Sequence, residues 1–210
     1  MRFKLFMALI LSVFLSNMAF ADIDEGIEYK RVSPAQPTIT KNKIEVVELF
    51  WYGCPHCFHF EPNIKGWLAK KPDNVVFVRI PAVFNPKWEL HARAFYAAKS
   101  LGLFDNGKLE FHEAVFNEIH KKKNHLHKKK DFQEIFSRFG ISKDDFENAF
   151  DSFAVNTKVN RAATLSKRYQ LDGVPTLIVN GKYRTDGPMA GGRNGMIKVL
   201  DFLVRKESKK

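Results

Sequence analysis

Residues 44–57, IEVVELFWYGCPHC, decide the fold because an apolar run leads directly into a turn that carries two cysteines. Ile44–Phe50 is rich in Val, Ile and Leu, which is typical of a largely buried strand. After the turn, apolar residues recur at helical spacing: Phe60, Ile64, Trp67 and Leu68. Val75–Ile80 is a second apolar run, and Pro81 ends it. Strand, helix and strand at this spacing predict a βαβ unit with parallel strands and a right-handed crossover.

The middle of the chain, from about residue 87 to residue 161, has no strand signal. Apolar residues recur there at helical spacing in five stretches, which predicts a block of helices. Ser142 and Asp145 resemble a capping box at the start of the fourth helix. That helix is expected to carry on one face Phe146, Ala149, Phe150 and Phe153.

Strand character returns near the C-terminus. Thr176–Val179 is apolar, and Asn180-Gly181 predicts a two-residue hairpin turn into Lys182–Arg184. A last helix is expected to bury Met196, Val199, Leu200 and Leu203. The polar lead-in at residues 22–43 is expected to include an edge strand. The predicted order is therefore β-α-β, a helical block, and β-β-α.

The first twenty-one residues have the pattern of a secretory signal peptide. Arg2 and Lys4 give a charged start, Leu5–Leu15 is apolar, and Ala19-Phe20-Ala21 is a small-x-small cleavage site. We therefore expect an exported protein whose mature chain begins near Asp22. An uncleaved N-terminal anchor is the alternative.

The charge of the chain favours acidic partners. The net charge is +11, and removal of Arg2 and Lys4 with the signal leaves +9, since 11 minus 2 is 9. Export argues against nucleic acid as the partner. The run from His120 to Lys130 holds three histidines and six lysines; like charges repel a cation, so we expect a solvated basic surface rather than a metal site. His59 and His91 are expected at the surface or at the edge of the core.

The two cysteines of the chain, Cys54 and Cys57, are separated by only two residues. A bridge that short constrains the unfolded chain very little, so stability is a poor reason for it. Their position at the start of a helix has a chemical consequence. Unpaired N–H groups and the helix dipole stabilise a thiolate at Cys54 and lower its pKa.

The residues between the cysteines suit the same chemistry. Pro55 fits the first helical position, where its missing N–H is not needed. His56, when protonated, favours the neighbouring thiolate, and Cys57 faces inward as a resolving thiol. A stabilised thiolate makes the disulfide form a better oxidant. A zinc site would need two further ligands, which no second CxxC supplies.

Glu48 to Cys57 (ELFWYGCPHC) and the distant Gly173-Val174-Pro175-Thr176 resemble the DsbA thiol:disulfide interchange proteins of the bacterial periplasm. The resemblance implies an α/β, thioredoxin-like fold with an inserted all-helical domain. The thioredoxin-like domain would comprise residues 22–86 and 162–210, and the insert residues 87–161.

The resemblance also implies roles for individual residues. Cys54 would react first and Cys57 would resolve the mixed disulfide. Val174 and Pro175, joined by a cis bond, would expose backbone to an extended substrate chain. Glu48 and Glu61 would tune the inner cysteine and its proton transfers. Their alternative interpretation is a strand-end carboxylate and a solvated helix residue.

Together these expectations describe a monomeric, periplasmic oxidase that donates its Cys54–Cys57 disulfide to reduced, newly exported proteins. It would need no cofactor or metal beyond that redox-active disulfide. By resemblance, a quinone-linked membrane protein of the DsbB type would reoxidise it. The alternatives are an isomerase or reductase, an exported binding or chaperone module with an inert bridge, and a protein that docks on an anionic membrane or an acidic partner.

Overall fold

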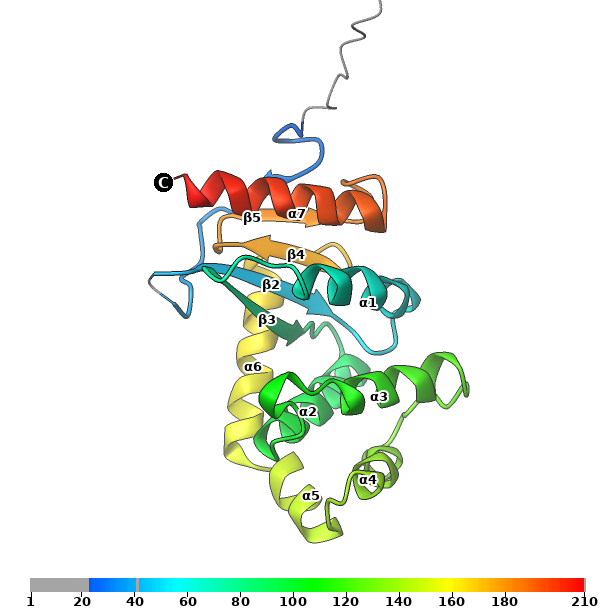
Figure 1. Cartoon of the computed structure of the whole chain (residues 1–210). Helices are drawn as coiled ribbons and strands as arrows, with labels where there is room; N and C mark the ends of the chain where they lie inside the picture. Colours follow the sequence, from blue (N-terminus) through cyan, green and yellow to red (C-terminus); the bar gives the residue numbers. More distant parts are fainter. Residues whose placement is uncertain (1–22, 41, 210) are drawn as a thin grey trace, which may run out of the picture.

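The computed structural model describes residues 23–40 and 42–209. The predicted signal peptide, its cleavage site and Asp22 lie outside the described residues. A five-stranded sheet with the strand order β1-β5-β4-β2-β3 forms the centre of the described part of the chain (Figure 1). The strands are β1 (Lys30–Arg31), β2 (Ile44–Phe50), β3 (Val75–Pro81), β4 (Thr176–Val179) and β5 (Tyr183–Asp186).

The central strand β2 connects the two halves of the sheet. It pairs in parallel with β3, with Glu48 opposite Arg79, and antiparallel with β4, with Glu48 opposite Leu177. Every residue of β2 is buried, as expected for a strand covered on both faces. The parallel pair confirms the predicted βαβ unit, and β1 confirms the predicted edge strand because it pairs only with β5 in the described sheet.

The predicted hairpin joins β4 and β5, which pair antiparallel, but its loop is longer than expected: Val179 lies opposite Tyr183, so Asn180, Gly181 and Lys182 connect the strands instead of two residues. Asn180 and Gly181 have φ angles of 53° and 64°, the positive values that favour Asn and Gly in tight turns. Gly181 is required for a second reason. A Cβ atom there would lie 2.0 Å from the carbonyl oxygen of Gln36, whose N–H donates to the Gly181 carbonyl oxygen at 2.9 Å.

Seven α-helices lie in the described residues. They are α1 (Pro55–Leu68), α2 (Pro86–Ser100), α3 (Glu110–His120), α4 (Lys129–Arg138), α5 (Lys143–Phe150), α6 (Phe153–Arg168) and α7 (Arg193–Ser208). Helices α1 and α7 cover one face of the sheet, and the end of α6 covers the other (Figure 1). Side chains alternate accordingly: Val46 packs toward α1 and α7, and Val47 toward Leu165 and Tyr169 at the end of α6.

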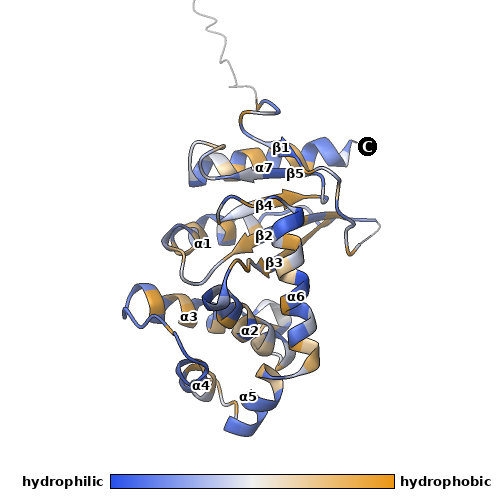
Figure 2. Cartoon of the chain, turned by 180° about the vertical axis from the view of Figure 1, so that it is seen from behind, coloured by the Kyte–Doolittle hydropathy of each residue, from blue (hydrophilic) through white to orange (hydrophobic). Residues whose placement is uncertain are grey.

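Helices α2 to α5 lie beyond the β3 edge of the sheet (Figures 1 and 2). Phenylalanine is the commonest residue of their core, which is continuous with the C-terminal end of β2, because Phe50, Tyr52 and both cysteines belong to the same buried cluster. The orange colouring of β2, β3 and β4 in Figure 2 marks the second, strand-based part of the interior. The inserted helices therefore form one wall of the region around the cysteines.

Three expectations from the sequence need correction or remain open. Phe153 does not belong to the fourth predicted helix: α5 ends at Phe150, and Ser152 caps a new helix by accepting the N–H of Val155. Phe153 begins that helix and is 85% exposed. His91 is buried in the helical core rather than at its edge. The division of the chain into domains stays a prediction, and α6 runs unbroken through the expected boundary after residue 161.

No helix in residues 23–40 and 42–209 is long and apolar enough to span a membrane.

Candidate active site

Cys54 occupies the N-cap position of α1. Its φ and ψ angles of −88° and 116° are extended, and its carbonyl oxygen accepts the N–H of Phe58 at 3.1 Å as the helix begins. Pro55 takes the first helical position, as the sequence predicts. The first-turn N–H groups have no partner within a helix, so those of His56 and Cys57 can donate to the sulfur of Cys54.

Hydrogen bonds to the sulfur lower the pKa of Cys54 from its ordinary value of 9.0 to about 6. The hydrogen bond from the Cys57 thiol contributes most; partial burial acts against it, and the N–H groups of Cys57 and His56 and the charge of His56 add to the lowering. The protonated thiol has a different partner, because Cys54 Sγ then donates to the carbonyl oxygen of Val174 at 3.2 Å. The thiol and the thiolate of Cys54 therefore use different hydrogen bonds.

Cys57 lies one helical turn further into the protein and is completely buried, whereas Cys54 is 8% exposed. Burial raises the pKa of Cys57 well above 9.0, and the hydrogen bond to Cys54 and the charge of Glu48 raise it further. Both cysteines carry free thiols in this structure. The pair thus joins an acidic thiol near the surface to a thiol that keeps its proton.

The segment that follows α6 lies against Cys54. Val174 and Pro175 are joined by a cis peptide bond. Together with His56, Pro188 and Met196 they line a pocket of about 410 Å³ next to the helix start. The structure therefore brings together the cysteines, the residues between them and the Val-Pro pair, although 120 positions of sequence separate Cys54 from Val174.

Glu48 and Glu61 meet behind the cysteines in a buried charged cluster. Arg79 of β3 lies between them: its Nε donates to Glu48 Oε2 at 2.9 Å and its Nη2 to Glu61 Oε2 at 3.2 Å. His112 of α3 contacts the other oxygen of Glu61 at 3.2 Å through Nε2. Its Nδ1 lies 3.0 Å from the hydroxyl oxygen of Tyr52. We refer to Glu48, Arg79, Glu61, His112 and Tyr52 as the buried charge network.

The two carboxyl groups of this network have opposite pKa shifts. Burial raises the pKa of Glu48 to about 7; the Arg79 guanidinium lowers it and the charge of Glu61 raises it. Burial also acts to raise the pKa of Glu61, but the hydrogen bond from His112 and the charge of Arg79 outweigh it, and that pKa lies below its ordinary value of 4.5. Glu61, whose side chain is only 15% exposed, is therefore not the solvated helix residue of the alternative interpretation, and Glu48 is fully buried in its strand.

Several residues of the site were not found from the sequence. Arg79 had a signal, since it is the one charged residue in the apolar run VVFVRIP of β3, and a charge in a buried strand needs a partner. Tyr52 and His112 had none, because each looks like an ordinary core position. His120 also approaches the site: its ring stacks on Phe58 with 4.8 Å between ring centres, and its Nε2 lies 2.8 Å from the Tyr52 carbonyl oxygen.

The remaining histidines and lysines of the basic run lie away from any metal-like cluster. From Lys121 to Lys128 every side chain except Leu126 is exposed, which agrees with the expected basic surface. His59 is exposed as well. Over residues 23–40 and 42–209 no three His, Cys, Asp or Glu side chains are grouped so that they could hold a metal ion.

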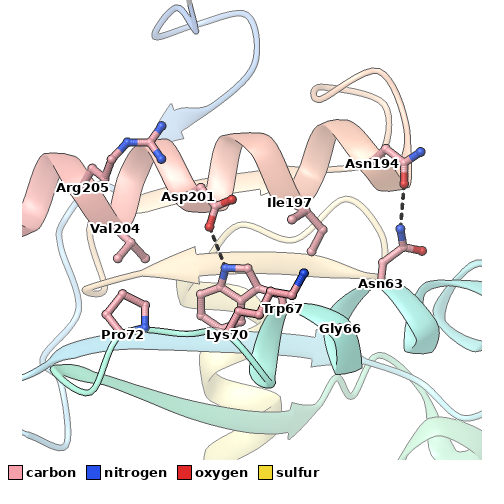
Figure 3. A pocket seen from close by; sticks show the side chains of 10 residues that line it. All are labelled: Asn63, Gly66, Trp67, Lys70, Pro72, Asn194, Ile197, Asp201, Val204 and Arg205. Atoms are coloured by element: carbon pink, nitrogen blue, oxygen red, sulfur yellow. Dashed lines mark hydrogen bonds between the residues drawn. The ribbon is translucent and has the colours of Figure 1, made fainter.

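A second groove lies between α1 and α7, away from the cysteines (Figure 3). Two hydrogen bonds join the helices across it: Trp67 Nε1 donates to Asp201 Oδ1 at 2.8 Å, and Asn63 Nδ2 donates to Asn194 Oδ1 at 2.7 Å. None of the residues that line it is a predicted site residue. These contacts fix the position of α1, and hence of its cysteine-bearing N-terminus, on the sheet.

Comparison with known proteins identifies the family. Residues 45–203 match the family model of the DSBA-like thioredoxin domain. The chain is 44% identical over 193 residues to the thiol:disulfide interchange protein DsbA of Pseudomonas syringae pv. tomato, which covers 92% of this chain and 88% of that protein. It is 37% identical over 203 residues to the corresponding protein of Burkholderia cepacia, with 96% of this chain and 94% of that protein covered.

Solved structures agree with this result. The crystal structure of Pseudomonas aeruginosa DsbA matches with a TM-score of 0.83 at 41% identity, over 90% of this chain and 98% of that chain. The α/β, thioredoxin-like fold with helices inserted between β3 and β4 is therefore confirmed. The chain belongs to the DSBA-like thioredoxin family and is a thiol:disulfide oxidoreductase.

Proposed function

We propose that this oxidoreductase works as a dithiol oxidase and donates the Cys54–Cys57 disulfide to newly exported proteins. The observation that carries the proposal is the contrast between the two thiols. The pKa of Cys54 is lowered to about 6, while Cys57 is fully buried with a raised pKa. A thiolate that is stabilised in the reduced protein favours the dithiol over the disulfide, so the disulfide is readily given away.

The reaction needs no cofactor beyond the cysteine pair. A client thiolate attacks Cys54 Sγ, the bond between the two enzyme sulfurs breaks, and Cys57 leaves and takes up a proton. A second client thiolate then attacks the client sulfur of the mixed disulfide and releases Cys54 as a thiolate. The client loses two electrons and gains a disulfide, and the enzyme becomes a dithiol.

Clients would bind beside Cys54 in the pocket formed by His56, Val174, Pro175, Pro188 and Met196. The Val174 carbonyl oxygen, which accepts a hydrogen bond from the Cys54 thiol, is positioned to pair with an extended client backbone. The DsbA of Proteus mirabilis has been solved with a non-covalently bound peptide, PWATCDS. A similar mode of binding to this chain is part of the proposal.

The proposal also includes the cellular setting. The protein is exported to the periplasm after cleavage behind Ala21, acts as a monomer, and is reoxidised by a quinone-linked membrane protein of the DsbB type. N-terminal sequencing of the periplasmic fraction tests the export and the cleavage site. Loss of in-cell oxidation of Cys54 when the membrane partner is removed tests the reoxidant.

The decisive experiment is the equilibrium reduction potential of the Cys54–Cys57 pair against glutathione, with the Cys54 pKa measured in parallel. A potential well above that of the glutathione couple supports the oxidase. A potential close to that of thioredoxin, with an ordinary Cys54 pKa, refutes it and favours a reductase or isomerase. A cysteine pair that does not exchange with glutathione at all would indicate an inert bridge in a binding or chaperone module.

A further inference from the structure

His112 is a fully buried histidine whose two ring nitrogens both contact polar groups. Aromatic rings surround it, with ring-centre distances of 5.0 Å to Phe50 and 4.9 Å to Phe116. A histidine that only filled this space would need neither polar contact. The arrangement therefore suggests that its hydrogen bonds have a role in the buried charge network.

The contacts determine which nitrogen carries the proton. Glu61 is held ionised beside Arg79, and a carboxylate can only accept hydrogen bonds, so Nε2 of His112 must donate to Glu61 Oε1. The Nδ1 atom then has a free lone pair and accepts a hydrogen bond from the Tyr52 hydroxyl group. Burial lowers the pKa of His112, and burial raises the pKa of Tyr52, so the imidazole stays neutral and the phenol keeps its proton.

The network contains two carboxyl groups and one guanidinium. Arg79 donates to both carboxyls, so it does not by itself decide which of them keeps a proton. His112 breaks this symmetry because it donates only to Glu61. Within the described residues, Glu48 Oε1 is buried and has no hydrogen-bond partner. A carboxyl with an unpaired buried oxygen is the better place for the proton, because ionisation there leaves a charged oxygen without a hydrogen bond.

We propose that His112 is a positioning residue that holds the negative charge on Glu61 and thereby leaves the proton of the carboxyl pair on Glu48. Glu48 lies on the same face of β2 as Phe50, which packs in one buried cluster with Cys57, and the charge of Glu48 acts on the Cys57 thiol. When a client thiolate breaks the disulfide, Cys57 leaves as a buried thiolate. Glu48 then supplies the proton that neutralises Cys57 Sγ, Glu48 becomes ionised beside Arg79, and a proton from solvent later restores it.

Other charged groups near the network do not replace His112. Lys65 of α1 acts on Glu61 from the surface, but it pairs with Glu113 of α3 at 2.9 Å and both side chains are solvated. The titratable and charged groups that face the carboxyl pair from the packed elements are Tyr52, Cys57, Lys65, Arg79, His112 and Glu113. Of these, His112 and Arg79 alone donate to a carboxyl oxygen of the pair among the described contacts.

The test is to titrate the two carboxyl groups in the reduced protein and to observe each titration by carbon NMR of the Glu48 and Glu61 side chains. In His112→Phe we expect the pKa of Glu61 to rise and that of Glu48 to fall, because the donor to Glu61 is lost. His112→Gln can place an amide N–H near the position of Nε2, and we expect it to restore both values. His91→Phe removes a buried imidazole that contacts the Leu126 carbonyl oxygen and no carboxylate, so it is the matched control.

The same variants have a functional readout. If the Glu48 pKa falls by one unit from about 7, the protonated fraction at about pH 7 drops from about one half to about one tenth. We therefore expect an about five-fold slower disulfide transfer to a thiol peptide in His112→Phe at that pH, and no loss at about pH 5. His112→Gln should recover most of the rate.

Unchanged titrations of Glu48 and Glu61 in folded His112→Phe would overturn the proposal and leave His112 as a packing residue. If His112→Phe does not fold, His112→Asn carries the same expectation, because its shorter amide reaches toward Tyr52 and not Glu61. The inference rests on the proposed proton transfer at Cys57, yet the two can fail separately. If the pKa of Glu61 rises and that of Glu48 falls in His112→Phe while the rate of disulfide transfer stays the same, the role of Glu48 is refuted and that of His112 is retained.

Discussion

Replacement of His56 by proline tests how the start of α1 controls the chemistry of Cys54. His56 supplies two of the four interactions that lower the Cys54 pKa: its backbone N–H, which donates to the sulfur, and the charge of its ring. Proline has no N–H and no charge, and it fits the first turn of a helix because the N–H groups there have no helical partner. The hydrogen bonds from the Cys57 thiol and N–H remain.

The size of the effect follows from the Cys54 pKa. With a Cys54 pKa of about 6, ionisation at about pH 7 shifts the equilibrium between the disulfide and the reduced form toward the reduced form by about eleven-fold. With the ordinary pKa of 9.0, ionisation shifts this equilibrium hardly at all. Complete loss of the lowered pKa would therefore reduce the potential by about 30 mV, because a tenfold change corresponds to about 30 mV. Partial loss in His56→Pro, with a pKa rise of about 0.5–1 unit, corresponds to about 10–20 mV.

The assay combines the ultraviolet absorbance of the thiolate, which gives the Cys54 pKa, with glutathione equilibria at several pH values. At about pH 5 Cys54 is protonated in both proteins, so the potentials of wild type and variant should converge. His56→Ala is the matched control, since it removes the ring charge and keeps the N–H. A potential difference that persists at about pH 5 would refute the reasoning, because it would place the effect in the disulfide form rather than in the thiolate.

Three further predictions concern the residues behind Cys54. In Cys57→Ala, which removes the resolving thiol and the strongest donor to the Cys54 sulfur, the Cys54 thiolate should attack a disulfide-bonded peptide, release one peptide thiol and accumulate in mass spectra as a mixed disulfide, and the Cys54 pKa should rise; rapid turnover without that species would contradict the assignment. Arg79→Met leaves Glu48 and Glu61 without their shared cation, and denaturant unfolding should show a loss of about 3–5 kcal/mol; a loss below about 1 kcal/mol would contradict a network held by Arg79. Because the pKa of Glu48 is raised, the folded state between about pH 4.5 and about pH 7 retains a proton that the unfolded state has lost. The contribution of Glu48 to the free energy of unfolding therefore falls as the pH rises through that range. Glu48→Gln should abolish this pH dependence, and identical pH profiles of the unfolding free energy in wild type and variant would argue against it.

Most of the fold follows from local sequence patterns. The apolar run of β2, the Asn180-Gly181 turn and the helical repeats each contain their own signal, and the structure has a strand, a hairpin and a block of helices there, with a hairpin loop one residue longer than predicted. Phe153 shows where that kind of reasoning ends. The spacing between Phe150 and Phe153 fits one face of a single helix, but Ser152 caps a new helix between them. Phe153 is therefore the first residue of α6, where its ring is exposed to solvent.

The site was less accessible to sequence reasoning. The CPHC motif lies on one continuous stretch, so its helix-start chemistry could be derived from residue order alone. Val174 and Pro175 entered through family resemblance, and nothing local connects them to Cys54. The buried charge network needed the tertiary structure, because β2, α1, β3 and α3 each contribute one member and the turn after β2 contributes Tyr52. A histidine such as His112, set among phenylalanines, gives no sign in the sequence that its nitrogens contact a carboxylate and a phenol.

The two ends of one helical turn give the cysteines opposite properties, and this asymmetry determines the order of the reaction. Cys54 ionises easily because the Cys57 thiol and the N–H groups at the helix start donate to its sulfur, whereas burial, the hydrogen bond to Cys54 and the charge of Glu48 raise the pKa of Cys57. When the disulfide opens, the negative charge therefore ends on Cys54 and the proton on Cys57. A proton must reach a fully buried sulfur in that step, and the buried carboxyl with a pKa of about 7 is Glu48. In the oxidase that we propose, the helix start makes the disulfide oxidising, and Glu48 of the buried charge network supplies the proton that the oxidation requires.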